Sequence, residues 1–488
     1  MNYVLLAPEI LLTVLALIVI FIGLLVSDRS KNMLGYISAA GLVASLVYVL
    51  GTKGEGSFFY NALVIDPLSQ FFKLIFIVVS LLAVIASIKY FENNRNQDEY
   101  YALILLATVG MMVVASANDL VSLFVGFELA SMSTYVLAGF EKKNPASLEA
   151  ALKYFIIGSL SSALMLFGMS LVYGVTGSTN ITAIIEFFKA NPAVSGLDVI
   201  AMVFLVAGFG FKMALVPFHM WAPDTYEGSP SVVSALLAAG SKKMGFVAAF
   251  RVLVLALVAL RADLWVTFGI LAVITMTYGN IVAISQRSIK RMLAYSSIAQ
   301  AGYIALAFVV TTQMSIAGGI LLALGHALMK GGAFIAVAVV GYMVLSDNKN
   351  AKNIDDIENF AGLGKRAPIT AFALFVFFLA LAGIPPSAGF IGKFVLFYSI
   401  TIEAVRQAST WFLIVVIIAI LNSALSIYYY ARVIRYMYVL PPAGEKIKEP
   451  APYVIAIVLA VIGTIGIGLY PQPFIEMAMN AANVVLGV

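Results

Sequence analysis

The residues of this 488-residue chain that could do chemistry are a few charged side chains inside long apolar segments. A lysine at the centre of a membrane helix costs about 2.5–3.5 kcal/mol, so its presence there needs a reason. A lysine near a helix end can instead extend its stem so that the amine reaches the headgroups, and we expect this of Lys73. Lysines occur inside the predicted spans at Lys73, Lys212, Lys242, Lys243, Lys330 and Lys393.

One acidic residue, Glu128, lies at a comparable depth, about nine residues into its predicted span. An isolated buried carboxylate takes up a proton, but a neighbouring ammonium group can keep both groups ionised. A buried Glu–Lys pair can therefore act as a proton switch. The alternative is a static ion pair that holds two helices in register.

Two predicted spans are interrupted beside a lysine. Pro217 removes a backbone donor five residues after Lys212, and Pro385 with Pro386 breaks a span seven residues before Lys393. Such breaks leave carbonyl groups unpaired at membrane depth, which is tolerated where the backbone lines protein or water. Two breaks in spans five apart, each near a lysine, suggest two related halves.

Further polar residues lie between the two breaks. Lys242 and Lys243 are adjacent in a predicted helix and diverge by about 100°, so we expect only one of them to face a given pathway. His326 and Lys330 are four residues apart and share a helix face. Histidine titrates near neutral pH, which suits a proton relay, whereas a metal site at His326 is disfavoured by the cationic lysine beside it.

The composition fixes the surroundings of these residues. Apolar residues make up 62% of the chain and charged residues 11%, which excludes an ordinary soluble enzyme and a disordered protein. The chain has no cysteine and two histidines, so we expect no disulfide, no zinc or iron–sulfur site and no cofactor of its own. The net charge of +5 is spread in isolated residues and pairs, which indicates membrane orientation and no nucleic-acid partner.

The apolar segments predict an all-α polytopic membrane protein. Each span requires about 20 mostly apolar residues, and continuous apolar runs exclude a β-barrel, whose strands would alternate. The first span has no basic leader or cleavage site, so we expect it to remain as a helix and not to be a cleavable signal. The connection between residues 116 and 119 is very short. About fourteen spans are predicted, near 3–26, 33–51, 66–88, 100–116, 119–139, 150–174, 199–221, 230–260, 264–285, 291–311, 315–345, 368–400, 410–438 and 452–472.

Lysine and arginine are distributed unequally between the loops. Eighteen of them follow odd-numbered spans, and five lie at or near the opposite surface, which are Lys53, Lys189, Arg251, Arg261 and Arg406. The positive-inside rule therefore predicts that both termini lie outside, with the odd-to-even loops in the cytoplasm.

Residues 1–488 are predicted to form a single transmembrane domain with an internal repeat. Spans 4–8, residues 100–260, align with spans 9–13, residues 264–440. An odd number of spans per unit makes the two five-helix units inverted in the membrane, with spans 7 and 12 broken. Transporters built in this way place ion sites near the midplane on discontinuous helices.

Several motifs then resemble a known family. The segment 289–303 is similar to a motif shared by the antiporter-like subunits of respiratory complex I and Mrp-type cation/proton antiporters. The segments around Glu128, 153–159, 210–230 and the His326/Lys330 helix also resemble that family, in the same order. Lys393 in the Gly-Ile-Pro-Pro-Ser-Ala-Gly-Phe-Ile-Gly-Lys segment is similar to subunit N, since subunit M typically has glutamate there.

The resemblance implies one proton path through the chain. On the matching positions, Glu128 pairs with Lys212 as the switch and Lys242 is the central relay. His326 and Lys330 connect the halves, and Lys393 faces the exit. No family role falls on Lys243.

The resemblance also implies partners. These would be the antiporter-like M and L subunits and small subunits of a membrane arm, with electron transfer to quinone or phenazine on other chains. The chain would then be a proton-translocating, non-redox subunit of an oxidoreductase in a cell membrane. The alternatives are a subunit of an Mrp-type sodium/proton antiporter, which shares the same motifs, and a purely structural membrane scaffold.

Overall fold

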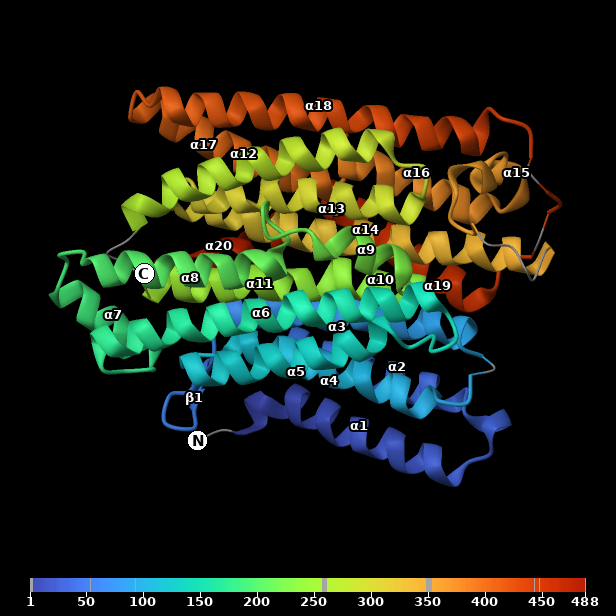
Figure 1. Ribbon diagram of the computed structural model, residues 1–488, viewed down its shortest axis with the longest axis horizontal. Coiled ribbons are helices and arrows are strands. Elements are labelled where there is room, and N and C mark those ends of the chain that lie inside the picture. The colour runs from blue at the N-terminus through green and yellow to red at the C-terminus, as the bar shows by residue number, and fades with distance from the viewer. Residues whose placement is uncertain are drawn as a thin grey trace.

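The computed structural model describes residues 3–52, 54–92, 94–256, 261–347, 353–442, 444–446 and 448–487, and it is a bundle of long, roughly parallel helices (Figure 1). The two chain ends lie at the same end of the bundle (Figure 1). The described residues hold one antiparallel hairpin, β1 (Gly56–Phe58) and β2 (Leu63–Ile65), which the all-α prediction did not include. Lys53, Lys349 and Lys352, loop lysines used to predict orientation, lie outside the described residues.

The first part of the chain forms a three-helix unit and the first predicted repeat. The N-terminal unit contains η1 (Tyr3–Leu6), α1 (Ala7–Leu25), η2 (Asp28–Ser30), α2 (Met33–Gly51) and α3 (Pro67–Tyr90). The region of the first repeat contains α4 (Gln97–Ser116), α5 (Leu120–Ala138), α6 (Pro145–Thr176), α7 (Ile181–Ala190), α8 (Gly196–Met213), α9 (Trp221–Gly228), α10 (Ser231–Leu236), the π-helix η3 (Leu237–Ser241), α11 (Lys242–Ala249) and the π-helix η4 (Phe250–Ala256).

The second predicted repeat and the C-terminal helices follow. They contain α12 (Arg261–Ser285), α13 (Ile289–Ala305), η6 (Leu306–Phe308), α14 (Gln313–Asp347), η7 (Ile357–Phe360), α15 (Leu363–Arg366), α16 (Pro368–Ala382), α17 (Ala388–Arg406), α18 (Thr410–Tyr438), α19 (Ala451–Leu469) and α20 (Gln472–Leu486).

The predicted membrane spans are present as helices. Within the described residues, thirteen helical segments are long and apolar enough to cross a membrane, and α13, with 17 residues, occupies the remaining predicted span. The short connection between α4 and α5 separates two helices because the Asp119 side chain accepts hydrogen bonds from the backbone of Val121 and Ser122 and so caps α5.

The centre of the bundle is formed by the segment from α10 to η4 and by α14. All of the most apolar 18 residues of the first segment are buried, and 83% of those of α14 are buried. By contrast, many large apolar side chains of α1 and α18 are exposed. The two central segments therefore pack against protein, and the outer helices present their apolar faces to lipid.

Both predicted helix breaks are present. The first lies between α8 and α9, where Ala214 has a left-handed φ of 56°. The second lies between α16 and α17, where Gly383 has a φ of 88°. The indole of Trp221 donates to the Phe211 carbonyl at 2.8 Å, so a polar side chain satisfies a carbonyl beside the first break.

The structure corrects the placement of two basic residues. Lys73 does not extend to the headgroups, because its side chain is 2% exposed and its Nζ lies 2.5 Å from Oε1 of Glu9 on α1. Arg251, expected near the surface, is also buried, and its guanidinium donates to both Asp66 carboxylate oxygens at 2.8 and 2.9 Å. In both cases a carboxylate inside the bundle is a closer partner than the membrane surface.

Candidate functional site

The predicted acid of the site, Glu128, lies in the middle of α5. Its carboxylate accepts a short hydrogen bond from the Ser162 hydroxyl of α6. The Glu128 side chain is half-buried, whereas the lysines described below are buried. Glu128 therefore lies closer to the surface of this chain than the buried lysines do.

Lys212 lies in the last turn of α8, directly before the first break, and is fully buried. Its Nζ donates to the Ser131 hydroxyl of α5 and to the Tyr154 hydroxyl of α6, each at 2.9 Å. Among the described residues, no ion pair within 4.0 Å joins Lys212 to Glu128, so the two predicted partners are not in direct contact. Ser131, about one turn beyond Glu128 on the same helix, accepts a hydrogen bond from Lys212.

The helix α13 connects two further predicted lysines through adjacent serines. Lys242 of α11 donates to the Ser297 hydroxyl at 2.9 Å and to the Ser297 carbonyl at 3.1 Å. Lys330 of α14 donates to the Ser296 hydroxyl at 2.7 Å and to the Leu293 carbonyl at 3.1 Å. The segment of α13 that carried the family motif therefore contacts both Lys242 of the first predicted repeat and Lys330 of the second.

Lys243 and His326 are in direct contact. The Nζ of Lys243 lies 2.5 Å from Nδ1 of His326 and 2.7 Å from the Ala238 carbonyl. Lys242 and Lys243 diverge as their helical spacing requires, but both contact polar groups of the site. The two lysines face different helices, Lys242 facing α13 and Lys243 facing α14.

Lys393 of α17 lies at the second break. Its Nζ donates to the Leu381 carbonyl and the Ser423 hydroxyl, both at 2.9 Å, and lies 4.5 Å from the centre of the Tyr303 ring. The Leu381 carbonyl also accepts from the Gln300 amide of α13 at 2.9 Å. The break thus leaves at membrane depth a carbonyl that both α13 and α17 contact.

These amines share one electrostatic feature. Among the described residues no carboxylate lies within ion-pair distance of Lys212, Lys242, Lys243, Lys330 or Lys393. Their acceptors are hydroxyls, carbonyls and one imidazole. A buried amine with uncharged acceptors can change between its charged and neutral forms without breaking an ion pair, which is a requirement for moving protons.

Polar pockets lie at both ends of the bundle. Where α6 and α13 begin, Asp224 accepts from Lys153 at 2.8 Å and from Arg291 at 2.9 Å, and Arg291 also contacts Glu227 at 2.6 Å. These groups line a pocket of about 410 Å³.

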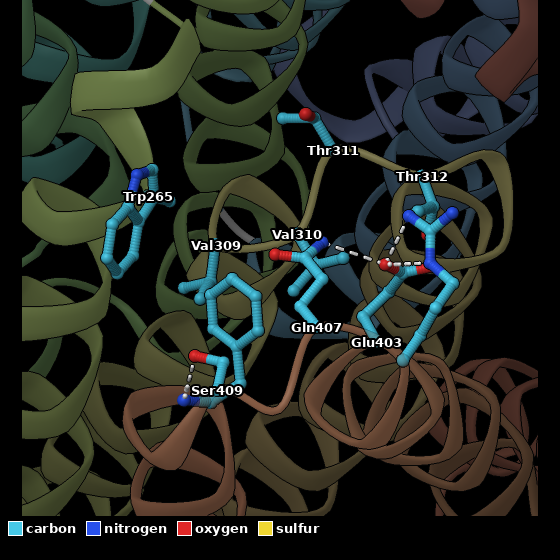
Figure 2. A pocket seen from close by; sticks show the side chains of 10 residues that line it. Trp265, Val309, Val310, Thr311, Thr312, Glu403, Gln407 and Ser409 are labelled. Carbon is cyan, nitrogen blue, oxygen red and sulfur yellow. Dashed lines mark hydrogen bonds and ion pairs between the residues drawn. The ribbon is translucent and has the colours of Figure 1, made fainter.

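At the other end, a second pocket lies beside the end of α17. Figure 2 shows Glu403 in contact with Gln407 and with a guanidinium group, with Trp265 across the pocket. The guanidinium belongs to Arg406, whose Nη2 lies 2.6 Å from the Glu403 carboxylate. Charged groups thus line a pocket at each end of the bundle.

Several site residues were not found from the sequence. They are uncharged and so do not stand out in an apolar helix, although four of them belong to the 289–303 motif. Polar residues of this kind are Ser131, Tyr154, Ser162, Ser296, Ser297, Gln300, Tyr303 and Ser423. In the described part of the chain, no group of three His, Cys, Asp or Glu side chains comes together.

A bundle of membrane helices with two broken spans and buried lysines defines an antiporter-like membrane protein. The chain belongs to the family described as NADH:quinone oxidoreductase/Mrp antiporter, transmembrane, whose model matches residues 117–426. It is 55% identical to F420H2 dehydrogenase subunit N of Methanosarcina mazei, over 99% of this chain and 98% of that one. It is 40% identical to NADH-quinone oxidoreductase subunit N of Trichlorobacter lovleyi, with 99% and 98% covered.

A solved structure agrees with the sequence relatives. A chain of respiratory complex I from Thermus thermophilus matches with a TM-score of 0.79 and 30% identity, over 96% of this chain and 98% of that one. Within the family, the similarity to subunit N predicted from Lys393 is confirmed by these relatives.

Proposed function

We propose that this chain is the proton-translocating, non-redox subunit N of a complex I-like oxidoreductase. The observation that carries the proposal is the set of buried amines and one imidazole that meet uncharged acceptors from α5 to α17. Buried lysines without carboxylate partners are unfavourable as packing elements, so a static scaffold does not account for five of them. Proton transfer through the chain accounts for all five of these lysines.

The proposed path has a defined order. Glu128 and Lys212 form the switch, with the Ser131 and Tyr154 hydroxyls as intermediates. Lys242 is the central relay, His326 and Lys330 connect the halves, and Lys393 serves the exit. Residues 100–260 and 264–440 act as the two inverted repeats, since each contains one broken span with a lysine near the break.

The relatives' names support the proposed partners. They are subunits of F420H2 dehydrogenase and of NADH-quinone oxidoreductase, so we place this chain among other membrane-arm subunits, with the redox centres on other chains. The loop charges support an orientation in which both termini lie on the outer side of a cell membrane. The pocket at Asp224 then faces the cytoplasm, and the pocket at Glu403 faces outward.

The test uses the whole complex in proteoliposomes. Glu128→Gln and Lys212→Ala should lower the number of protons moved per electron transferred, while the complex stays assembled. Glutamine at position 128 can keep the hydrogen bond with Ser162 but cannot take up and release a proton as a carboxylate does. Normal proton transfer in both variants, measured alongside electron transfer, contradicts the switch.

The alternative function is that of a subunit of an Mrp-type sodium/proton antiporter. Such a subunit would share the same motifs but have no redox partner. Purification separates the two functions. Recovery of an electron-input arm containing iron–sulfur clusters or flavin supports the proposed function. A complex free of iron and flavin that exchanges sodium for protons supports the antiporter.

A further inference from the structure

Lys243 is a buried amine to which the family pattern gives no role. It lies on α11 in the first half, directly after the π-helix η3, and its side chain is fully buried. Its Nζ has two partners among the described residues, the Ala238 carbonyl of η3 and Nδ1 of His326 on α14 in the second half. Lys243 therefore joins the two predicted repeats.

The local helix geometry explains how Lys243 is held. Ala238 lies five residues before Lys243, within the π-helical turn, and its carbonyl lies 2.7 Å from Nζ. Single π-helical turns inside α-helices occur often at functional sites. One partner of the amine is therefore a fixed backbone acceptor, and the other is a titratable ring.

The contact with His326 restricts the number of protons. Two nitrogens at hydrogen-bond distance need one N–H and one lone pair, so Lys243 and His326 cannot both be fully protonated in this arrangement. Either the ammonium donates to neutral Nδ1, or a protonated Nδ1 donates to the neutral amine. These two states differ by the transfer of a single proton along the hydrogen bond.

The other side of the His326 ring is also open to proton transfer. Nε2 is buried and has no hydrogen-bond partner among the described residues. A buried N–H or lone pair without a partner is unfavourable, and a water molecule is the small group that satisfies it. Lys330 lies one turn further along the same face of α14.

We propose that Lys243 is a relay residue that exchanges protons directly with His326 across the boundary between the repeats. The proposal rests on the proposed function. In the step, one N–H bond of the Lys243 ammonium breaks and the Nδ1–H bond forms. The Nε2–H bond of the imidazolium then breaks and its proton passes to water, so the ring returns to neutral and no electron is transferred.

A positioning role is the alternative. In that case Lys243 only holds the His326 ring in place by donating a hydrogen bond, and any residue that donates to Nδ1 would serve. Two variants of Lys243 distinguish the roles. Methionine keeps a side chain of similar size without an N–H donor, and glutamine keeps an N–H donor that cannot give up its proton.

The experiment compares variants of the whole complex in proteoliposomes, measuring protons per electron and thermal unfolding. Lys243→Met should slow proton uptake by about tenfold or more, since a positioned proton-transfer group contributes about 10²–10⁴-fold. Its unfolding temperature should be unchanged or higher, because the variant removes a buried amine that has no carboxylate partner. Lys243→Gln should be as impaired as Lys243→Met.

A double variant tests whether the two residues act as one unit. Lys243→Met, His326→Gln and the double variant should lose the same amount of proton transfer, since residues in direct contact are not additive. The matched control is Lys73→Met with Glu9→Gln, which removes another buried lysine and its partner away from the site. This control should pump normally.

The contradicting results are distinct. Full pumping by Lys243→Gln leaves only a positioning role, and full pumping by Lys243→Met removes any role in proton transfer. If Lys242→Ala is impaired while Lys243→Met is normal, the relay fails and the proposed function stands. If Lys242→Ala also pumps normally, the proposed function itself fails.

Discussion

At the scale of single residues, the identity of the cation matters more than its charge. Lys242 and Lys393 meet hydroxyl and carbonyl acceptors that tolerate both the charged and the neutral amine. Arginine keeps its charge at any pH that a protein meets, so it can donate the same hydrogen bonds but cannot release the proton.

Lys242→Arg and Lys393→Arg should therefore impair proton translocation even though the positive charge is retained. We expect about a tenfold or greater loss of proton uptake per turnover, as is typical when a proton-transfer group is lost. Proton uptake and electron transfer should be measured together in proteoliposomes that contain the whole complex. Normal uptake by both arginine variants would leave helix packing as the better explanation of these lysines.

Gln300 gives a prediction for an uncharged residue of the site. It is buried, its amide shares the Leu381 carbonyl with Lys393, and its Oε1 has no partner among the described residues. A water at Oε1 would extend the polar contacts between Ser296 and Lys393. Gln300→Leu removes this contact and should lower proton uptake without dissociating the complex.

The control for Gln300→Leu is another buried glutamine. Gln97→Leu changes a side chain that is equally buried and also has an unpartnered Oε1, but it lies at the start of α4, away from the site. Equal losses of proton uptake in the two variants would show a general effect on folding and would exclude a local role of Gln300.

The difference between charged and uncharged side chains explains which site residues could be predicted from the sequence. Lys212, Lys330 and Lys393 were identified because charges in apolar segments are rare and unfavourable. Serine and tyrosine are common in membrane helices, so Ser296 and Tyr154 gave no such signal. Which of the many hydroxyls contacts a lysine depends on helix packing, which a single sequence does not contain.

At the scale of helices, the two breaks position the lysines. Gly383 ends α16 with a φ of 88°, and a Cβ at this position would lie 3.1 Å from Cδ of Lys393. A non-glycine residue in a left-handed conformation costs about 1–2 kcal/mol. Glycine at this position therefore permits both the turn and the close approach of Lys393.

Gly383→Ala should reduce both stability and proton translocation, by about 1–2 kcal/mol for the turn and through displacement of Lys393. Ala214 occupies the matching turn of the first break with a φ of 56° and already has a Cβ. Ala214→Gly is therefore the control and should leave proton uptake unchanged while stability stays equal or rises. Thermal unfolding of the purified complex and proton uptake measure the two effects. A Gly383→Ala variant that matches the parent in both would show that the break does not position Lys393.

Helix positions were predicted better than helix details. The spans follow from apolar length, and the breaks follow from Pro217 and Pro385–Pro386, because proline removes a backbone donor. The π-helical turns at 237–241 have no such marker, and the structure places them against the helix that carries His326. The hairpin formed by β1 and β2 is also too short to produce a pattern in the sequence.

At the scale of the whole molecule, proton translocation requires that the two ends of the bundle face different compartments. The pocket around Asp224 and Arg291 lies where α6 and α13 begin, and the pocket around Glu403 lies where α17 ends. The two chain ends lie together at one end of the bundle (Figure 1). An even number of spans puts both termini on the same side of the membrane, but it does not determine which side that is. The loop charges predict the side.

Single cysteines can test that direction because the chain has none of its own. Lys142 precedes α6 and Lys189 lies at the end of α7, and both side chains are exposed. By the positive-inside rule, Lys142→Cys should react with a membrane-impermeant maleimide only in inside-out vesicles, and Lys189→Cys only in right-side-out cells or spheroplasts. Neither lysine contacts the buried amines, so both variants should keep proton uptake. The opposite labelling pattern would reverse the molecule in the membrane, so that the Glu403 pocket would receive protons and the Asp224 pocket would release them.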